Sequence, residues 1–124
     1  MAGELILIVE DNEKNRRLVR DVLQFKGYQT IETETGEEGV ELARSRQPAL
    51  VLMDIQLPGI DGITALKRLR EDPTTHAMRV MAVTASAMTQ DRQNILAAGF
   101  DGYQSKPINV KSFLEAVETL LQRP

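Results

Sequence analysis

Acidic side chains stand just beyond two apolar runs of this chain. Glu10 and Asp11 follow the run at residues 5–9, and Asp54 follows the run at residues 50–53. If both runs are neighbouring parallel strands, the three carboxylates share one pocket, because ligands of open α/β sheets bind beyond the carboxyl ends of the strands. Unpaired carboxylates 4 Å apart repel by about 4 kcal/mol per pair at an effective dielectric constant near 20. We therefore expect a cationic group in this pocket.

A hydroxyl and an amine stand at comparable places later in the chain. Thr84 directly follows the apolar run 80–83, and Lys106 closes a short fifth strand expected at 101–104, with Pro107 behind it. If these segments belong to the same parallel sheet, their ends meet at the edge that carries the acids. The pocket would then gather carboxylates, a hydroxyl and an ammonium group.

These groups suit phosphoryl chemistry supported by a metal ion. Hard oxygen ligands favour Mg²⁺, which binds through one or two carboxylates plus a phosphate oxygen, so we expect Glu10 and Asp11 to hold it. Asp54, in the centre, can act as a carboxylate nucleophile and form an aspartyl phosphate. Lys106 and Thr84 would contact the phosphoryl oxygens, since such a transfer needs mostly positioning and neutralisation of negative charge.

The apolar runs predict the elements that position these groups. Runs 5–9, 50–53 and 80–83 are short and continuous, as is typical of strands buried on both faces of a parallel sheet. Two further strands are expected at 28–33 and 101–104, each after a glycine that stands where a helix C-terminus favours one. The sequence therefore predicts five strands.

The segments between these strands have the spacing of amphipathic helices. Apolar residues recur at helical intervals in the first and the last of them, at 18–23 and 113–121. Capping residues precede three of the helices: Asn12, Thr35 with Glu38, and Asn109. Alternating strands and helices predict an α/β fold with a doubly wound parallel sheet and helices on both faces.

Length and composition restrict the class of protein. The 124 residues, 42% of them hydrophobic, predict a single domain over residues 1–124. A net charge of -3 and the lack of a basic, aromatic-rich stretch disfavour direct binding of nucleic acid. No apolar run approaches the roughly 20 residues of a membrane span, and no signal segment opens the chain. We therefore expect a cytoplasmic protein, and because the chain has no cysteine, oxygen ligands are what remain for a metal.

Four short motifs carry a resemblance to a known family. They are Glu10-Asp11-Asn12, the stretch from Met53 to Gly62, Val83-Thr84-Ala85 and Ser105-Lys106-Pro107. Along the whole chain the sequence resembles response regulator receiver (CheY-like) domains, in particular free-standing receivers of the DivK type and the receivers of hybrid histidine kinases. The resemblance implies a flavodoxin-like (βα)5 fold with strand order 2-1-3-4-5 and Mg²⁺-dependent phosphorylation by a histidine kinase or a histidine phosphotransferase.

The resemblance also implies roles for individual residues. Asp54 would be the phosphoacceptor, and Glu10, Asp11, Asp54 and the backbone carbonyl of Gln56 would bind the metal. Thr84 would be one half of the pair that senses the phosphoryl group.

The other half of that pair would be Lys106, and the bond from it to Pro107 is expected to be cis. Tyr103 falls at the position of an aromatic switch, and it would meet a downstream partner together with Ala87 and Met88. These three residues belong to the face formed by the fourth helix, the fifth strand and the fifth helix.

Gln56 bears on whether the protein is an enzyme. Haloacid-dehalogenase-type phosphatases, which also form an aspartyl phosphate, place a second aspartate two residues after the first as a general acid and base. Gln56 stands there in this chain, and an amide cannot do that work. We therefore expect a long-lived phosphoryl group and no phosphatase turnover.

Simpler interpretations exist for single residues. Each acid alone is more often a helix N-cap or a first-turn residue favoured by the helix dipole, but the combination with Thr84 and Lys106 favours the functional interpretation. For Tyr103, a switch and an ordinary edge-strand aromatic are equally supported. Arg16 and Arg17 are expected on the exposed face of the first helix.

Three rival functions stay open at this point. The chain could be a receiver-fold binding module that works without phosphate, or a small phosphatase. It could also be a receiver fragment of a hybrid histidine kinase, although a start at Met1 and an end at Pro124, soon after the fifth helix, suit a whole protein. With no output domain after Pro124, the signal is expected to leave through protein contacts.

Overall fold

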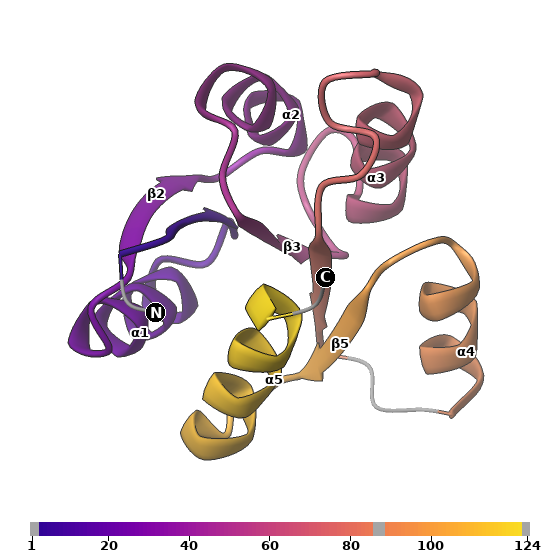
Figure 1. The fold of residues 1–124 in the computed structure, drawn as a ribbon. Helices are drawn as coiled ribbons and strands as arrows, with labels where there is room; N and C mark the ends of the chain where they lie inside the picture. Colours follow the sequence, from indigo (N-terminus) through magenta and orange to yellow (C-terminus); the bar gives the residue numbers. More distant parts are fainter. Residues whose placement is uncertain (1–2, 86–88, 123–124) are drawn as a thin grey trace.

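Five strands and five helices alternate along the chain in the computed structural model, which describes residues 3–85 and 89–122. All strand pairs are parallel, and the sheet has the order β2-β1-β3-β4-β5 that was predicted. Helices α1 and α5 lie on one face of the sheet and α2, α3 and α4 on the other (Figure 1). The elements are β1 Leu5–Val9, α1 Glu13–Phe25, β2 Gln29–Thr33, α2 Gly36–Arg46, β3 Leu50–Asp54, α3 Gly62–Glu71, β4 Val80–Thr84, α4 Thr89–Ala97, β5 Gly102–Ser105 and α5 Val110–Gln122.

The strand ends differ from the predicted ones by about one residue. Asp54 and Thr84 are the last residues of β3 and β4, not the residues that follow them, and β5 ends at Ser105 instead of 104. The ladder continues because the Ile55 N–H donates to the Val83 carbonyl at 3.2 Å and the Lys106 N–H to the Thr84 carbonyl at 2.8 Å. Backbone hydrogen bonds, and not the apolar run, therefore decide where these strands end.

Side chains cap the helices that begin at the carboxyl edge of the sheet. The predicted caps Asn12 and Thr35 accept from the backbone N–H three residues later, and Asn109 does the same for Ser112 at 3.1 Å. Asp61 caps α3 by accepting from Thr64 at 2.8 Å. Each cap satisfies a backbone donor that would otherwise lack a partner at a helix start.

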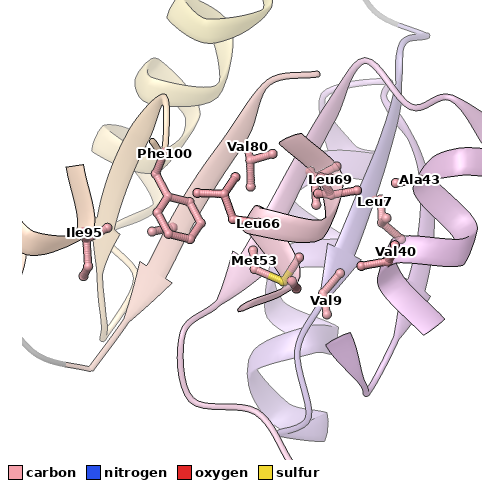
Figure 2. Packing of buried hydrophobic residues seen from close by; sticks show 13 residues of the cluster. Leu7, Val9, Val40, Ala43, Met53, Leu66, Leu69, Val80, Ile95 and Phe100 are labelled. Carbon is pink, nitrogen blue, oxygen red and sulfur yellow. The ribbon is translucent and has the colours of Figure 1, made fainter. Parts of the chain in front are cut away.

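Two apolar layers hold the sheet. The layer under α2, α3 and α4 joins Leu7, Val9 and Met53 of the central strands to Leu66 and Phe100, all 5% exposed or less (Figure 2). The layer under α1 and α5 is built from Ile6, Ile8, Leu23, Leu52, Phe113 and Val117, among others. Full burial of one such side chain stabilises the fold by about 1.5–3 kcal/mol, so the strands that end at the pocket are firmly anchored.

The described part of the chain contains no helix that is both long enough and apolar enough to cross a bilayer. The compartment in which the protein works stays a prediction.

Candidate phosphoacceptor and metal site

The predicted acids meet at the carboxyl edge of the sheet. Glu10 comes one residue after β1, Asp11 follows it, and Asp54 ends the neighbouring strand β3. One carboxylate oxygen from each residue lies within 4.8 Å of the other two. Glu10 and Asp54 are each 4% exposed, whereas Asp11 is open to solvent. The pocket thus has two buried acids and one at its mouth.

Lys106 supplies a cation between the two buried acids. Its Nζ atom lies 2.8 Å from Oε1 of Glu10 and 3.1 Å from Oδ2 of Asp54. Lys106 reaches both acids because β5 ends at the same carboxyl edge of the sheet, one residue before Lys106. One ammonium facing three carboxylates leaves the pocket with an excess of negative charge.

Backbone donors hold the second oxygen of each buried carboxylate. The N–H of Asn12 donates to Oε2 of Glu10 at 3.1 Å, and the N–H of Gln56 donates to Oδ1 of Asp54 at 3.1 Å. Both acids therefore have all their oxygens engaged, which fixes their orientation. Charge-assisted bonds of this kind are roughly twice as strong as neutral ones.

The pKa of Glu10 is raised from 4.5 to about 7. Burial is the main cause, and the neighbouring Asp54 carboxylate adds to it, while Lys106 and the Asn12 N–H oppose it. For Lys106, burial lowers the pKa, but the hydrogen bonds to Glu10 and Asp54 outweigh it and the pKa is raised. The ammonium therefore stays charged, and the acids keep the capacity to hold a second cation.

The loop after β3 approaches the pocket closely because Gly62 has no side chain. A Cβ atom at this position would lie 2.3 Å from the carbonyl oxygen of Asp54, which is far inside van der Waals contact. The Gly62 N–H donates to the Ile55 carbonyl at 2.9 Å and closes the loop. The start of α3 thus packs directly on the backbone of Asp54. Within this loop the Gln56 side chain is exposed, and metal binding by its carbonyl stays a prediction.

The remaining predicted residues lie on β4 and β5. Thr84 is 2% exposed, and it pairs with Ser105 of β5. Val83, the residue before it on β4, pairs with Asp54 of β3. Tyr103 is partly buried on β5, and the guanidinium carbon of Arg92 lies 5.6 Å from the centre of its ring.

The Lys106–Pro107 peptide bond is cis. Ala87 and Met88, which we expected on the partner face, lie outside the described residues.

Known proteins are similar to this chain in sequence and in fold. The family model described as response regulator receiver domain matches residues 6–118 of the chain. The chain belongs to this family. Its sequence is 45% identical to the polar-differentiation response regulator DivK of Brucella ovis over 116 residues, which cover 94% of each chain, and it has the same identity and coverage with DivK of Brucella abortus.

Solved receiver structures have the same fold as this receiver. The receiver domain of a sensor histidine kinase from Pseudomonas aeruginosa, described with magnesium coordinated in its active-site cleft, aligns with a TM-score of 0.91 at 30% identity and covers 98% of this chain and 100% of that one. A putative response regulator from Chloroflexus aurantiacus aligns with a TM-score of 0.93 at 29% identity, covering 98% and 99%. The receiver fold predicted from the motifs is therefore confirmed.

One residue of this receiver was predicted wrongly and matters for the site. Arg17 is exposed as expected, but the side chain of Arg16 is only 16% exposed and its Nη1 donates to the carbonyl of Glu10 at 2.9 Å. The helical period of α1 gave no signal for this contact, because it depends on the turn before the helix. The sequence also contains no signal for the close approach of Gly62 to Asp54, which follows only from the packing of α3.

Proposed function

We propose that this receiver accepts a phosphoryl group on Asp54 in an Mg²⁺-dependent reaction and signals through protein contacts that depend on phosphorylation. The observation that supports this most is the position of Lys106, whose Nζ bridges Glu10 and Asp54. A buried carboxylate that carries an ammonium on one oxygen and a backbone N–H on the other is oriented to react and has a cation ready for the incoming phosphoryl oxygens.

The donor set fits Mg²⁺. Glu10, Asp11 and Asp54 offer three hard oxygen atoms within 4.8 Å of one another, and the carbonyl of Gln56 is the fourth proposed ligand. The raised pKa of Glu10 supports the fit, because it reflects burial and negative charge that a divalent cation would relieve. When bound, the ion neutralises charge on the transferred group and fixes its oxygens.

The transfer itself is a displacement at phosphorus. A carboxylate oxygen of Asp54 attacks the phosphoryl group of a phosphohistidine, and the new P–O bond forms as the P–N bond breaks. The electron pair of that bond stays on the imidazole nitrogen of the donor. Lys106 and the hydroxyl of Thr84 then contact the phosphoryl oxygens, which carry a charge of about -1.5 to -2.

The same contacts supply a switch. Drawing Thr84 toward the phosphoryl group vacates space into which the ring of Tyr103 moves, and this remodels the face formed by α4, β5 and α5. A shift from 1:99 to 99:1 between two states needs about 5.5 kcal/mol, which a few charge-assisted contacts can provide. The stacking of Arg92 on Tyr103 ties α4 to this movement.

The phosphoryl group on Asp54 is long-lived. No general acid or base stands two residues after the acceptor, where this chain carries Gln56. Catalysis is therefore limited to the protein's own phosphorylation and slow dephosphorylation, and rapid release of phosphate from a small phosphomonoester would contradict this proposal.

The partners follow from the chemistry. The donor is a histidine kinase or a histidine phosphotransferase, and the reader of the signal is a protein that binds the α4, β5 and α5 face. We propose that residues 1–124 work as one receiver unit in the cytoplasm, whether alone or as part of a hybrid kinase.

The decisive test is phosphorylation with acetyl phosphate, or binding of beryllofluoride, with and without Mg²⁺. Intact mass and amide NMR shifts would compare the wild type with Asp54→Asn. A modification that requires both Asp54 and Mg²⁺, with shift changes that reach Tyr103, is the expected result. If neither modification nor shift changes occurred, the phosphate-independent binding module would become the better account.

A further inference from the structure

Arg16 holds the turn that carries the two acids after β1. It lies in the first turn of α1, where its own N–H donates to the carbonyl of Asn12 at 2.9 Å. Its side chain is 16% exposed and reaches back, so that Nη1 donates to the carbonyl of Glu10 at 2.9 Å. That carbonyl belongs to the peptide plane that joins Glu10 to Asp11. Fixing this plane fixes the positions of the N and Cα atoms of Asp11, from which its side chain leaves the backbone.

Asp11 is the acid that most depends on this plane. Glu10 is already held at its other polar atoms by Thr33, Asn12 and Lys106. Within residues 3–85 and 89–122, by contrast, the exposed Asp11 side chain makes no hydrogen bond or ion pair. Its place beside the other acids therefore comes from its backbone.

The charge of Arg16 is balanced away from the pocket. Nε lies 3.2 Å from Glu32 and Nη1 lies 3.5 Å from Glu34, while Arg20 contacts the second oxygen of Glu32 at 3.2 Å. Two arginines face two glutamates, and Arg20 also contacts Asp21 at 3.4 Å, so acidic groups outside the pocket balance the charge of Arg16. The two glutamates keep the guanidinium on the backbone carbonyl and away from the carboxylates that would bind a metal ion.

We propose that Arg16 is a positioning residue for the divalent cation site, acting through the Glu10–Asp11 peptide plane. Because Arg16 acts through Glu10 and Asp11, its role rests on the proposed function. The two possible effects of this arginine have opposite signs. As a nearby cation it repels Mg²⁺, so its removal would strengthen binding by electrostatics alone. As a clamp on the turn it favours binding, so its removal would weaken it.

The test measures the Mg²⁺ dissociation constant of the full chain by amide NMR shifts, with Arg16→Met and with Arg20→Met as the matched control. Methionine keeps an apolar stem on α1 and removes the donors. Both variants lose a contact with Glu32, and Arg16→Met also loses the hydrogen bond to the Glu10 carbonyl, so its unfolding midpoint in the absence of metal is expected to fall further than that of Arg20→Met. We expect Arg16→Met to bind Mg²⁺ roughly 10-fold more weakly, as is typical when a group that orients metal ligands is lost. Arg20→Met is expected to bind as the wild type does.

The outcomes separate this role from the proposed function. No Mg²⁺ binding by the wild type would overturn the proposed metal site and the role of Arg16 with it. Binding by the wild type together with equal or tighter binding by Arg16→Met would overturn the role of Arg16 alone. If Arg16→Met did not fold, Arg16→Lys would decide. It keeps the positive charge but not the planar fork, so weaker binding would support the role and unchanged binding would contradict it.

Discussion

Charged side chains gather at both edges of the sheet, but they are arranged differently at each edge. At the amino ends of β4 and β5, Arg70 of α3 donates to the carbonyls of His76 at 3.0 Å and Gly99 at 3.1 Å, and also to the carbonyl of Met78. Its Nη2 lies 3.0 Å from Oδ2 of Asp101. At the carboxyl ends, one lysine contacts two of three neighbouring carboxylates, and the pKa of one of these two, Glu10, is raised to about 7.

The difference separates a structural cluster from the candidate site. Asp101 accepts from the Val80 N–H at 2.8 Å as well as from Arg70, so the amino-end cluster pairs opposite charges and ties loops together. The carboxyl-end cluster holds like charges together, which costs stability in the absence of a further cation. Paired opposite charges stabilise a fold, whereas an excess of negative charge indicates a site that binds a cation.

The largest contrast is expected when the same substitution is made at both edges. Asp54→Asn should abolish the mass increase produced by acetyl phosphate and Mg²⁺, because the nucleophilic carboxylate is gone. Asp101→Asn removes a carboxylate at the opposite edge and should leave the yield of phosphorylation unchanged. Intact mass spectrometry of both variants provides the measurement. Full modification of Asp54→Asn would contradict the distinction between the two edges of the sheet.

Arg70→Ala should destabilise the fold without changing the affinity for Mg²⁺. Its loss removes the hydrogen bonds from Arg70 to three loop carbonyls and its ion pair with Asp101, for which we expect the free energy of unfolding to fall by about 2 kcal/mol. Urea unfolding measures the change, and Arg68→Ala on the exposed side of the same helix is the control. A loss of Mg²⁺ affinity in Arg70→Ala, or an equal destabilisation by Arg68→Ala, would contradict the division between the two edges.

Glu10→Gln should stabilise the protein in the absence of metal. Since the pKa of Glu10 is raised from 4.5 to about 7, its contribution to stability is fully present below pH 4.5 and is lost as the pH rises through 7. At pH 8 we expect the variant to be more stable than the wild type by about 1 kcal/mol, with little difference at pH 4.5. Urea unfolding with EDTA at both pH values tests this, and the exposed Glu13→Gln is the control. A variant that is less stable at pH 8 would show that the pocket is a structural ion pair.

The smallest effect is expected at Asp72, a partly buried acid after α3. Hydrogen bonds from the Thr74 hydroxyl and N–H, followed by Arg44, lower the pKa of Asp72 to about 2. The contribution of this acid to stability is therefore present above pH 3.8 and is lost as the pH falls through 2, which is the opposite sign to Glu10. Thermal melts of Asp72→Asn should show a slightly lower midpoint than the wild type at pH 6 and the same midpoint at pH 2. An equal deficit at both pH values would mean that the carboxylate charge is not the cause.

The sequence predicted the fold because the strands of this sheet are buried on both faces. Continuous apolar runs at β1, β3 and β4 can be recognised without knowledge of their neighbours, and the residues after them fall at one edge by topology alone. The convergence of Glu10, Asp54 and Lys106 followed from that topology. The ends of the strands did not, since hydrogen bonds from Ile55 and Lys106 extend the ladder beyond the apolar residues.

What could not be predicted are contacts between side chains and the backbone. Arg16 and Arg70 both lie on amphipathic helices, where the period predicts only whether a residue faces the core or the solvent. Each is long enough to reach carbonyls in another segment, and the position of those carbonyls depends on the finished packing. The missing side chain of Gly62 matters for the same reason, because the carbonyl of Asp54 comes near it only after α3 has docked.

The bridge that Lys106 forms between Glu10 and Asp54 also has a consequence for the chain while it folds after synthesis. Lys106 lies 52 positions after Asp54 and directly follows β5, the last strand of the chain. A partly folded chain whose β5 has not yet docked presents the acids without their ammonium. If phosphorylation requires that ammonium, a kinase can modify only molecules that have finished folding, and the phosphorylated pool is then free of immature copies.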